Sequence, residues 1–277
     1  MIFSRELKFN FGKTIAWIIV LSILTGLFLS LFPLMQDVNM KGLFDSFVAS
    51  LSEKLSKVLG FDERVDYTNI GQYLAFVYQY VAVLTCIFAM QLGASSLSKE
   101  QGLGSIEYIY SNPISRSEIV SAKLMANILN FIIFLAIILA INFGLTAIIP
   151  KFIPMDKISF TNLEVLTYLG KIFLSLLGSG LVFMSIGFFF SAMTKSTNFS
   201  EATSLLFVIL AVILVMIGKV YGGMFFEVIR NFPFEVFKPI KFLLNSFSIF
   251  GIIVNLAAFV IFTLLTYLIY GAKEFDY

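Results

Sequence analysis

The sequence predicts an all-α integral membrane protein with six transmembrane helices. Two observations lead to this fold class. The 277 residues are 59% hydrophobic and only 13% charged, whereas soluble domains carry about 25% charged residues. The apolar residues also gather in runs of roughly 20 or more, the length that crosses a bilayer as a helix. Lipid must therefore be the solvent for much of the chain.

Each of the six apolar runs is continuous and does not alternate with polar residues, which predicts helices and excludes a β-barrel. Four of them follow a capping pattern, in which a Ser, Thr or Asn stands three positions before Glu or Gln. These pairs are Asn69 with Gln72, Ser115 with Glu118, Thr161 with Glu164, and Asn198 with Glu201. The predicted spans are Thr14–Met35, Gly71–Leu97, Ile119–Ile149, Val165–Met193, Ala202–Gly218 and Phe247–Gly271.

Three polar segments flank or join these spans. Residues 2–8 alternate apolar and charged side chains, which predicts an N-terminal interfacial helix before the first span. Residues 36–70 form an extracytoplasmic loop, in which apolar residues from Met40 to Leu59 fall at helical spacing and Gly60 follows as a stop. This amphipathic helix lies along the membrane or caps the spans. Residues 219–246 contain two prolines and predict an interfacial or re-entrant segment.

The basic residues of the N-terminal tail place both termini in the cytoplasm. Arg5, Lys8 and Lys13 outnumber Glu6 there, and positively charged ends stay inside. Six spans return the C-terminus to the same side. The predicted outer loops also carry lysines and arginines, so the charge rule alone supports this topology only in part.

No catalytic site is visible in the sequence. The chain has no histidine and one cysteine, Cys86, which excludes Ser–His and Cys–His nucleophiles and thiolate metal sites. Gly12-Lys13-Thr14 resembles the end of a phosphate-binding loop but lacks the earlier glycine and the preceding strand. The net charge of +2 and the lack of a basic block argue against nucleic acid.

The central parts of the spans also lack ionisable residues, which disfavours an ion-coupled transporter. Lys123, Lys171 and Glu201 lie near span ends, where we expect the side chains to snorkel to the interface or to cap a helix.

The loop between the second and third spans, residues 98–118, contains start and stop signals for a short rigid helix. Gly102 and Gly104 permit a sharp turn, Ser105 can cap a helix, and Asn112-Pro113 ends it. A helix of roughly two turns would thus lie across the membrane end, joined directly to two spans. Such an element suits the transmission of force from a partner.

This loop resembles the cytoplasmic signature of the permease subunits of type-two ABC exporters. That family shows Gly-Thr, an apolar residue and Glu, followed by Pro, an apolar residue, Ser or Thr, and Arg, and commonly by a Lys seven positions later. Ser105 replaces the usual Thr. The matching residues are Gly104-Ser105-Ile106-Glu107-Tyr108-Ile109, Pro113-Ile114-Ser115-Arg116, Ile119 and Lys123.

The resemblance implies a single permease domain over residues 1–277 in the cell membrane of a bacterium. It implies a dimer, with a homodimer favoured over a heterodimer, and two copies of a separate ABC ATPase subunit. No cofactor would be bound in this chain, because the ATPase holds the ATP and Mg. The loop would be the coupling helix, and its expected contacts with the ATPase are Glu100, Gly104, Glu107, Tyr108, Ser111, Pro113 and Arg116.

Small residues in the fourth span predict close helix packing, either within the chain or at a dimer face. They include Gly178, Gly180 and Gly187. The smooth apolar spans suggest an amphipathic or lipidic cargo, such as a peptide. Two alternatives stay open: a secondary transporter or channel, and a membrane protein without transport activity, such as an immunity or sensor protein.

Overall fold

The computed structural model describes residues 2–61, 65–99, 114–152 and 160–273. Within these ranges the chain is helical and has no β-strand, and six helices are long and apolar enough to cross a membrane. The predicted all-α fold with six spans is therefore confirmed. The spans are α1 (Ile2–Ser30), α4 (Ile70–Ala94), α7 (Arg116–Thr146), α8 (Asn162–Met193), α9 (Thr197–Tyr221) and α13 (Ile249–Ala272).

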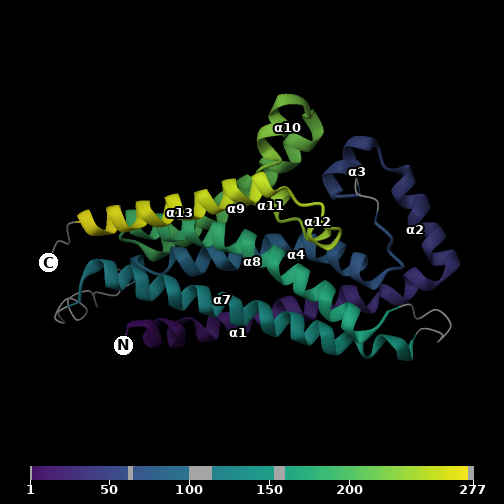
Figure 1. The fold of residues 1–277 in the computed structure, drawn as a ribbon, viewed down its shortest axis with the longest axis horizontal. Coiled ribbons are helices and arrows are strands. Elements are labelled where there is room, and N and C mark those ends of the chain that lie inside the picture. Colours follow the sequence, from purple (N-terminus) through teal and green to yellow (C-terminus); the bar gives the residue numbers. More distant parts are fainter. Residues whose placement is uncertain (1, 62–64, 100–113, 153–159, 274–277) are drawn as a thin grey trace.

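The six spans form one elongated bundle, in which α1 begins and α13 ends at the same end (Figure 1). We call this the terminal end, and the opposite one the cap end. Short helices join the spans at the cap end. They are η1 (Phe32–Gln36), α2 (Val38–Ser50), α3 (Glu53–Leu59), η2 (Ile149–Lys151), α10 (Gly223–Ile229), α11 (Pro233–Val236) and α12 (Pro239–Leu243).

Helices α4 and α8 form the centre of the bundle. About two thirds of the residues in their most apolar windows are buried (67% each), against 11% for α13. The two helices cross where Gly93 and Gly187 face each other's backbones. A Cβ atom on Gly187 would lie 2.2 Å from the carbonyl oxygen of Met90. Only glycine permits this approach, which brings the two central spans into direct backbone contact.

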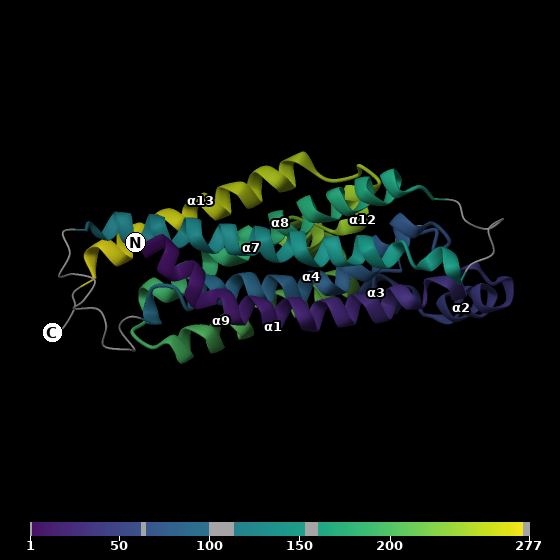
Figure 2. The same cartoon turned by 90° about the horizontal axis from the view of Figure 1, so that it is seen from below.

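Helices α1 and α7 form a second closely packed pair, held by hydrogen bonds between polar side chains. Thr14 Oγ1 donates to Asn130 Oδ1 at 2.8 Å, and Asn142 Nδ2 donates to Thr25 Oγ1 at 2.9 Å. All four side chains are buried. In a bilayer such bonds join helices for which lipid offers no hydrophobic driving force. Figure 2 shows α9 and α13 on opposite edges of the bundle.

The predicted helix starts are confirmed at three spans and wrong at one. Ser115 with Glu118 and Thr161 with Glu164 form complete capping boxes, and the Asn69 side chain caps α4. Helix α9 begins earlier than predicted, because Ser196, and not Asn198, caps it.

Two predicted segments differ from the structure. The N-terminal interfacial helix is not a separate element, because α1 is continuous from Ile2 to Ser30. The amphipathic helix of residues 36–70 is divided into α2 and α3. Leu51 is extended and the Ser52 side chain accepts a hydrogen bond from Leu55 N, so a second helix starts there. Gly60 ends α3 in the left-handed conformation, as predicted.

Candidate functional site

A buried carboxylate at the terminal end joins three parts of the chain. Glu6, in the first turns of α1, is 3% exposed. Its Oε1 atom lies 2.7 Å from Lys99 Nζ, and its Oε2 atom lies 3.9 Å from Lys123 Nζ. Lys99 follows α4 and Lys123 belongs to α7. One buried carboxylate therefore faces two buried ammonium groups, and their attraction offsets part of the cost of removing these charges from water.

Polar side chains around Glu6 complete this buried network. Asn10 Nδ2 donates to Glu6 Oε1 at 3.3 Å and to Asn127 Oδ1 at 2.7 Å. Asn127 Nδ2 donates to Ser96 Oγ at 3.1 Å, and Lys123 Nζ donates to the carbonyl oxygen of Ser96. The charges thus lie among fixed hydrogen-bonding groups, the condition under which a buried ion pair is tolerated.

The segment after α4 is also bound to α8. The backbone N–H groups of Leu97 and Ser98 donate to Ser191 Oγ at 2.8 and 2.9 Å. Ser191 lies near the end of α8 and is buried. Residues 96–99 are therefore tied to α1, α7 and α8, and they lead directly into residue 100, where the predicted coupling segment continues.

The other end of the same loop is tied to α13 through Arg116. Its guanidinium Nη1 donates to the carbonyl oxygens of Gly271 and Lys273 at 2.8 and 2.6 Å. Carbonyl groups at the end of a helix have no partner within the helix, and a cation there is favourable. Arg116 thus caps the terminal end of α13 and joins it to the first turn of α7.

Lys273 extends this connection to α8. Its Nζ atom donates to the carbonyl oxygens of Ala192 and Thr194 at 2.9 and 2.8 Å. Burial, together with the nearby positive charge of Lys195, lowers the pKa of Lys273 to about 8. The ends of α8 and α13 are therefore joined beside the loop.

A half-exposed ion pair links the terminal ends of α1 and α9. Lys13 Nζ lies 2.9 Å from Glu201 Oε1, and both side chains are about one third exposed. Lys13 therefore pairs with a carboxylate on another span. Among the residues that the structure describes, no group of three or more Cys, Asp or Glu could hold a metal ion.

Of the residues predicted to contact an ATPase, the structure describes Arg116 alone. Glu100, Gly104, Glu107, Tyr108, Ser111 and Pro113 lie outside the described residues. The three glycines of the fourth span contact other parts of the same chain: Gly178 lies against Phe237, Gly180 against Phe131, and Gly187 against the α4 backbone.

The sequence did not predict the role of Glu6 or Lys123. Lys123 was expected to snorkel to the interface, but its side chain is fully buried and points to Glu6 and Ser96. The available signals were an acidic residue, Glu6, close to the first span and a lysine, Lys123, within an apolar run. Nothing local indicates that the two are partners.

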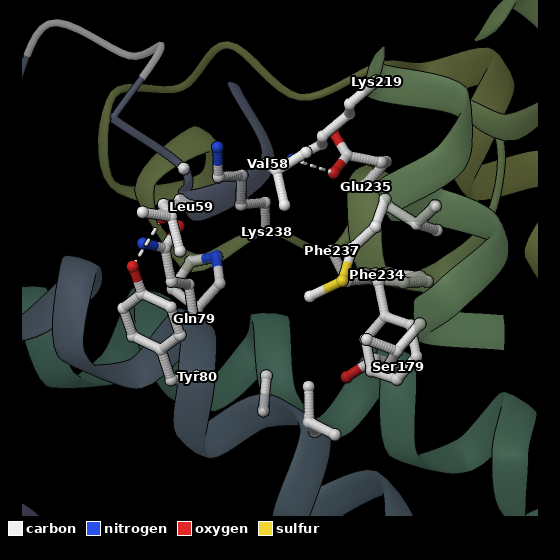
Figure 3. Close-up of a pocket in the computed structure, with 17 residues that line it drawn as sticks. Val58, Leu59, Gln79, Tyr80, Ser179, Lys219, Phe234, Glu235, Phe237 and Lys238 are labelled. Carbon is white, nitrogen blue, oxygen red and sulfur yellow. Dashed lines mark hydrogen bonds and ion pairs between the residues drawn. The ribbon is translucent and has the colours of Figure 1, made fainter. Parts of the chain in front are cut away.

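A second buried ion cluster lies at the cap end, around Glu235 of α11 (Figure 3). Lys219 Nζ at the end of α9 lies 2.7 Å from Glu235 Oε1, and Lys241 Nζ of α12 lies 3.4 Å from Glu235 Oε2. Burial raises the pKa of Glu235, but Lys219, Lys241 and Lys238 outweigh it, so the pKa lies below its ordinary value. The cluster ties the segment after α9 back onto that helix.

Beside this cluster is a pocket of about 110 Å³, which residues of α3, α4, α8, α9, α11 and α12 line. Figure 3 shows Lys238 and Gln79 on one side and Lys219 with Glu235 on the other. Residues 219–246 thus include three short helices, of which α11 and α12 pack against the spans and α10 stands out from the bundle (Figure 1).

Comparison with protein families gives one match. The family described as "ABC-2 family transporter protein" matches residues 13–275. No curated protein matches the chain significantly.

Proposed function

The chain belongs to the ABC-2 transporter family, the permeases of type-two ABC transporters, and we propose that it couples ATP hydrolysis by a separate ATPase subunit to cargo export. A permease of this family is a membrane transport component and not itself an enzyme. One observation carries the proposal: both ends of the loop 98–118 are tied to spans. Lys99 is bound to Glu6 of α1, and Arg116 to the end of α13.

Anchored loop ends are what a coupling element requires. Buried, hydrogen-bonded charges resist displacement, because separating them leaves an uncompensated charge in a medium of low dielectric constant. A push on residues 100–113 would therefore reach α1, α7, α8 and α13 with little loss in flexible segments. An ordinary solvated loop needs no such connection.

We further propose that the terminal end faces the cytoplasm of a bacterial cell. Two copies of an ABC ATPase would dock there, on a homodimer of this chain, and would bind the ATP and Mg. Arg5 and Lys8 in the first turns of α1 support this orientation. The proposed cargo is an amphipathic or lipidic molecule such as a peptide, because the spans offer few polar groups to an aqueous path.

Copurification tests the proposal. The chain is expressed together with a candidate ABC ATPase subunit and reconstituted in vesicles. We expect a stable complex and ATP hydrolysis that changes when amphipathic peptide is added. Arg116→Gln should lower this stimulation while the protein still inserts and binds lipid. A chain that never associates with an ATPase would contradict the proposal. Transport by the chain alone would instead indicate a secondary transporter. Absence of transport under all conditions would indicate an immunity or sensor protein.

A further inference from the structure

An apolar groove runs between α9 and α13 with α8 as its floor. Both outer helices pack on α8 and make little contact with each other, and they lie on opposite edges of the bundle in Figure 2. The groove has a volume of about 650 Å³. Its walls are almost wholly apolar and contain several aromatic rings. The lining residues include Phe183, Ile186, Phe207, Ala211, Ala258 and Phe262.

Polar groups occur at only one end of this groove, the cap end. There Glu227 and Asn231 join the lining, and Asn255 Nδ2 donates to the carbonyl oxygen of Asn231 at 2.9 Å. Glu227 Oε2 lies 2.7 Å from Arg230 Nη1, and both side chains are more than half exposed. The groove therefore ends at Glu227, whose exposed ion pair with Arg230 lies beside it.

The size of the groove argues against a helix of a second copy as its occupant. A spanning helix about 30 Å long and about 10 Å wide has a volume of roughly 2,400 Å³, more than the groove encloses, so a helix of a second copy could cover the groove but not lie within it. A volume of this size suits one small molecule or chain.

We propose that the groove binds one acyl chain of a zwitterionic phospholipid, with its headgroup at the Glu227–Arg230 pair. The phosphate would face Arg230 and the ammonium group would face Glu227, so each charge of the headgroup meets its opposite. The aromatic and branched walls would contact the chain along the groove. This site is independent of the ATPase, because no part of it lies at the terminal end.

A photoreactive lipid tests this proposal on the full-length protein. The probe is phosphatidylethanolamine with a diazirine in one acyl chain, added to phosphatidylcholine vesicles that contain the protein. Labelled positions are mapped by peptide mass spectrometry. We expect labels on the groove residues of α8 and α13. Ala258→Trp fills the groove and should lower this labelling about fivefold or more.

Ala257→Trp is the matched control. Ala257 is exposed and does not line the groove, so the same substitution should leave the labelling unchanged. Val228→Trp, at an exposed lining position on α10, provides a second block that does not perturb a span. Equal labelling in all these variants would overturn the proposal, as would cross-links between two protein copies in place of lipid.

The headgroup is tested separately by the double variant Glu227→Gln with Arg230→Gln. Labelling by the phosphatidylethanolamine probe should fall by a similar factor, whereas labelling by a diacylglycerol with the same chain should not change. Equal behaviour of the two probes would overturn the assignment of the headgroup. A loss of ATPase coupling would not overturn it, because labelling by the two lipid probes is measured without ATP.

Discussion

Glu6→Gln is the substitution that most directly tests the buried network at the terminal end. Glutamine keeps the shape of the side chain and still accepts hydrogen bonds from Asn10 and Ser96. It removes only the negative charge. Two ammonium groups then remain in the protein interior, since the Lys123 side chain is 0% exposed and that of Lys99 is 8% exposed.

The expected cost follows from this burial. Breaking a buried ion pair by neutralising one partner typically costs about 3–5 kcal/mol. For a chain of this size, 1 kcal/mol shifts the unfolding midpoint by roughly 2–4 °C, so we expect a decrease of about 10 °C. Glu201→Gln removes the carboxylate of the half-exposed pair with Lys13. Pairs of that kind contribute at most about 1 kcal/mol, so this control should shift by no more than about 4 °C.

The assay is thermal unfolding of the purified variants in one detergent, followed by circular dichroism at 222 nm. The double variant Glu6→Gln with Lys123→Met removes one charge of each sign and should recover part of the loss. Equal midpoints for Glu6→Gln and Glu201→Gln would refute the reasoning. The reasoning would also be refuted if the double variant unfolded at a clearly lower temperature than Glu6→Gln, because removing Lys123 would then only have cost a further contact.

Three further predictions concern other parts of the molecule. Arg116→Gln removes the cap from α13 and should speed hydrogen exchange in the last turn of that helix by about tenfold, since a capping interaction of this kind contributes roughly 1–2 kcal/mol. Gly187→Ala should lower stability by about 1–3 kcal/mol or more in chemical denaturation, because its Cβ atom would overlap the α4 backbone. The stabilisation by the Glu235 cluster should be fully present above pH 4.5, the ordinary pKa of glutamate, and be lost as the pH falls through the lower pKa of Glu235 in the folded state; exchange rates of residues 233–243 measure this.

Each of these has a control in the same chain. Arg230→Gln removes an arginine whose side chain is more than half exposed, and it should leave the exchange of α13 unchanged. Gly170 has open space around it, so Gly170→Ala should be neutral or slightly stabilising. In the variant Glu235→Gln the acid-dependent step should disappear. The same acid step in that variant would show that another carboxylate is responsible.

The spans could be predicted from the sequence because lipid imposes a simple rule on long apolar runs. The starts of α7 and α8 were also predictable, since the Ser115–Glu118 and Thr161–Glu164 boxes are local signals. The start of α1 was not. Glu6 and Asn10 look like residues of an aqueous tail, yet both are buried inside a helix. Hydropathy measures the cost of placing a polar group in lipid and contains no information about a partner on another helix.

The same limit explains the candidate site. The ammonium group of a lysine near a span end can either extend to the interface or pair with a buried carboxylate. The choice for Lys123 depends on Glu6, which belongs to another span and approaches it only in the folded bundle. The break between α2 and α3 is different in kind. Ser52 caps α3 and Glu53 follows in its first turn, so the start of α3 has a local signal in the sequence. The helical spacing of apolar residues continues from α2 across this start, and the prediction therefore treated both as one helix.

The strengths of these connections indicate how the bundle would respond to a force at the loop. Helices α1, α7, α8 and α13 are joined at the terminal end by buried charges and by hydrogen bonds at helix ends. Among the described residues, α9 has one ion pair to another span there, Lys13–Glu201, and it is partly exposed. Exposed pairs are weak and buried ones are costly to break. The four tied spans would therefore move together, and the displacement would concentrate at α9. Because Lys219 and Glu235 join α11 to the other end of α9, while α12 packs on α4 and α8, a displacement of α9 would act on the segment of α11 and α12.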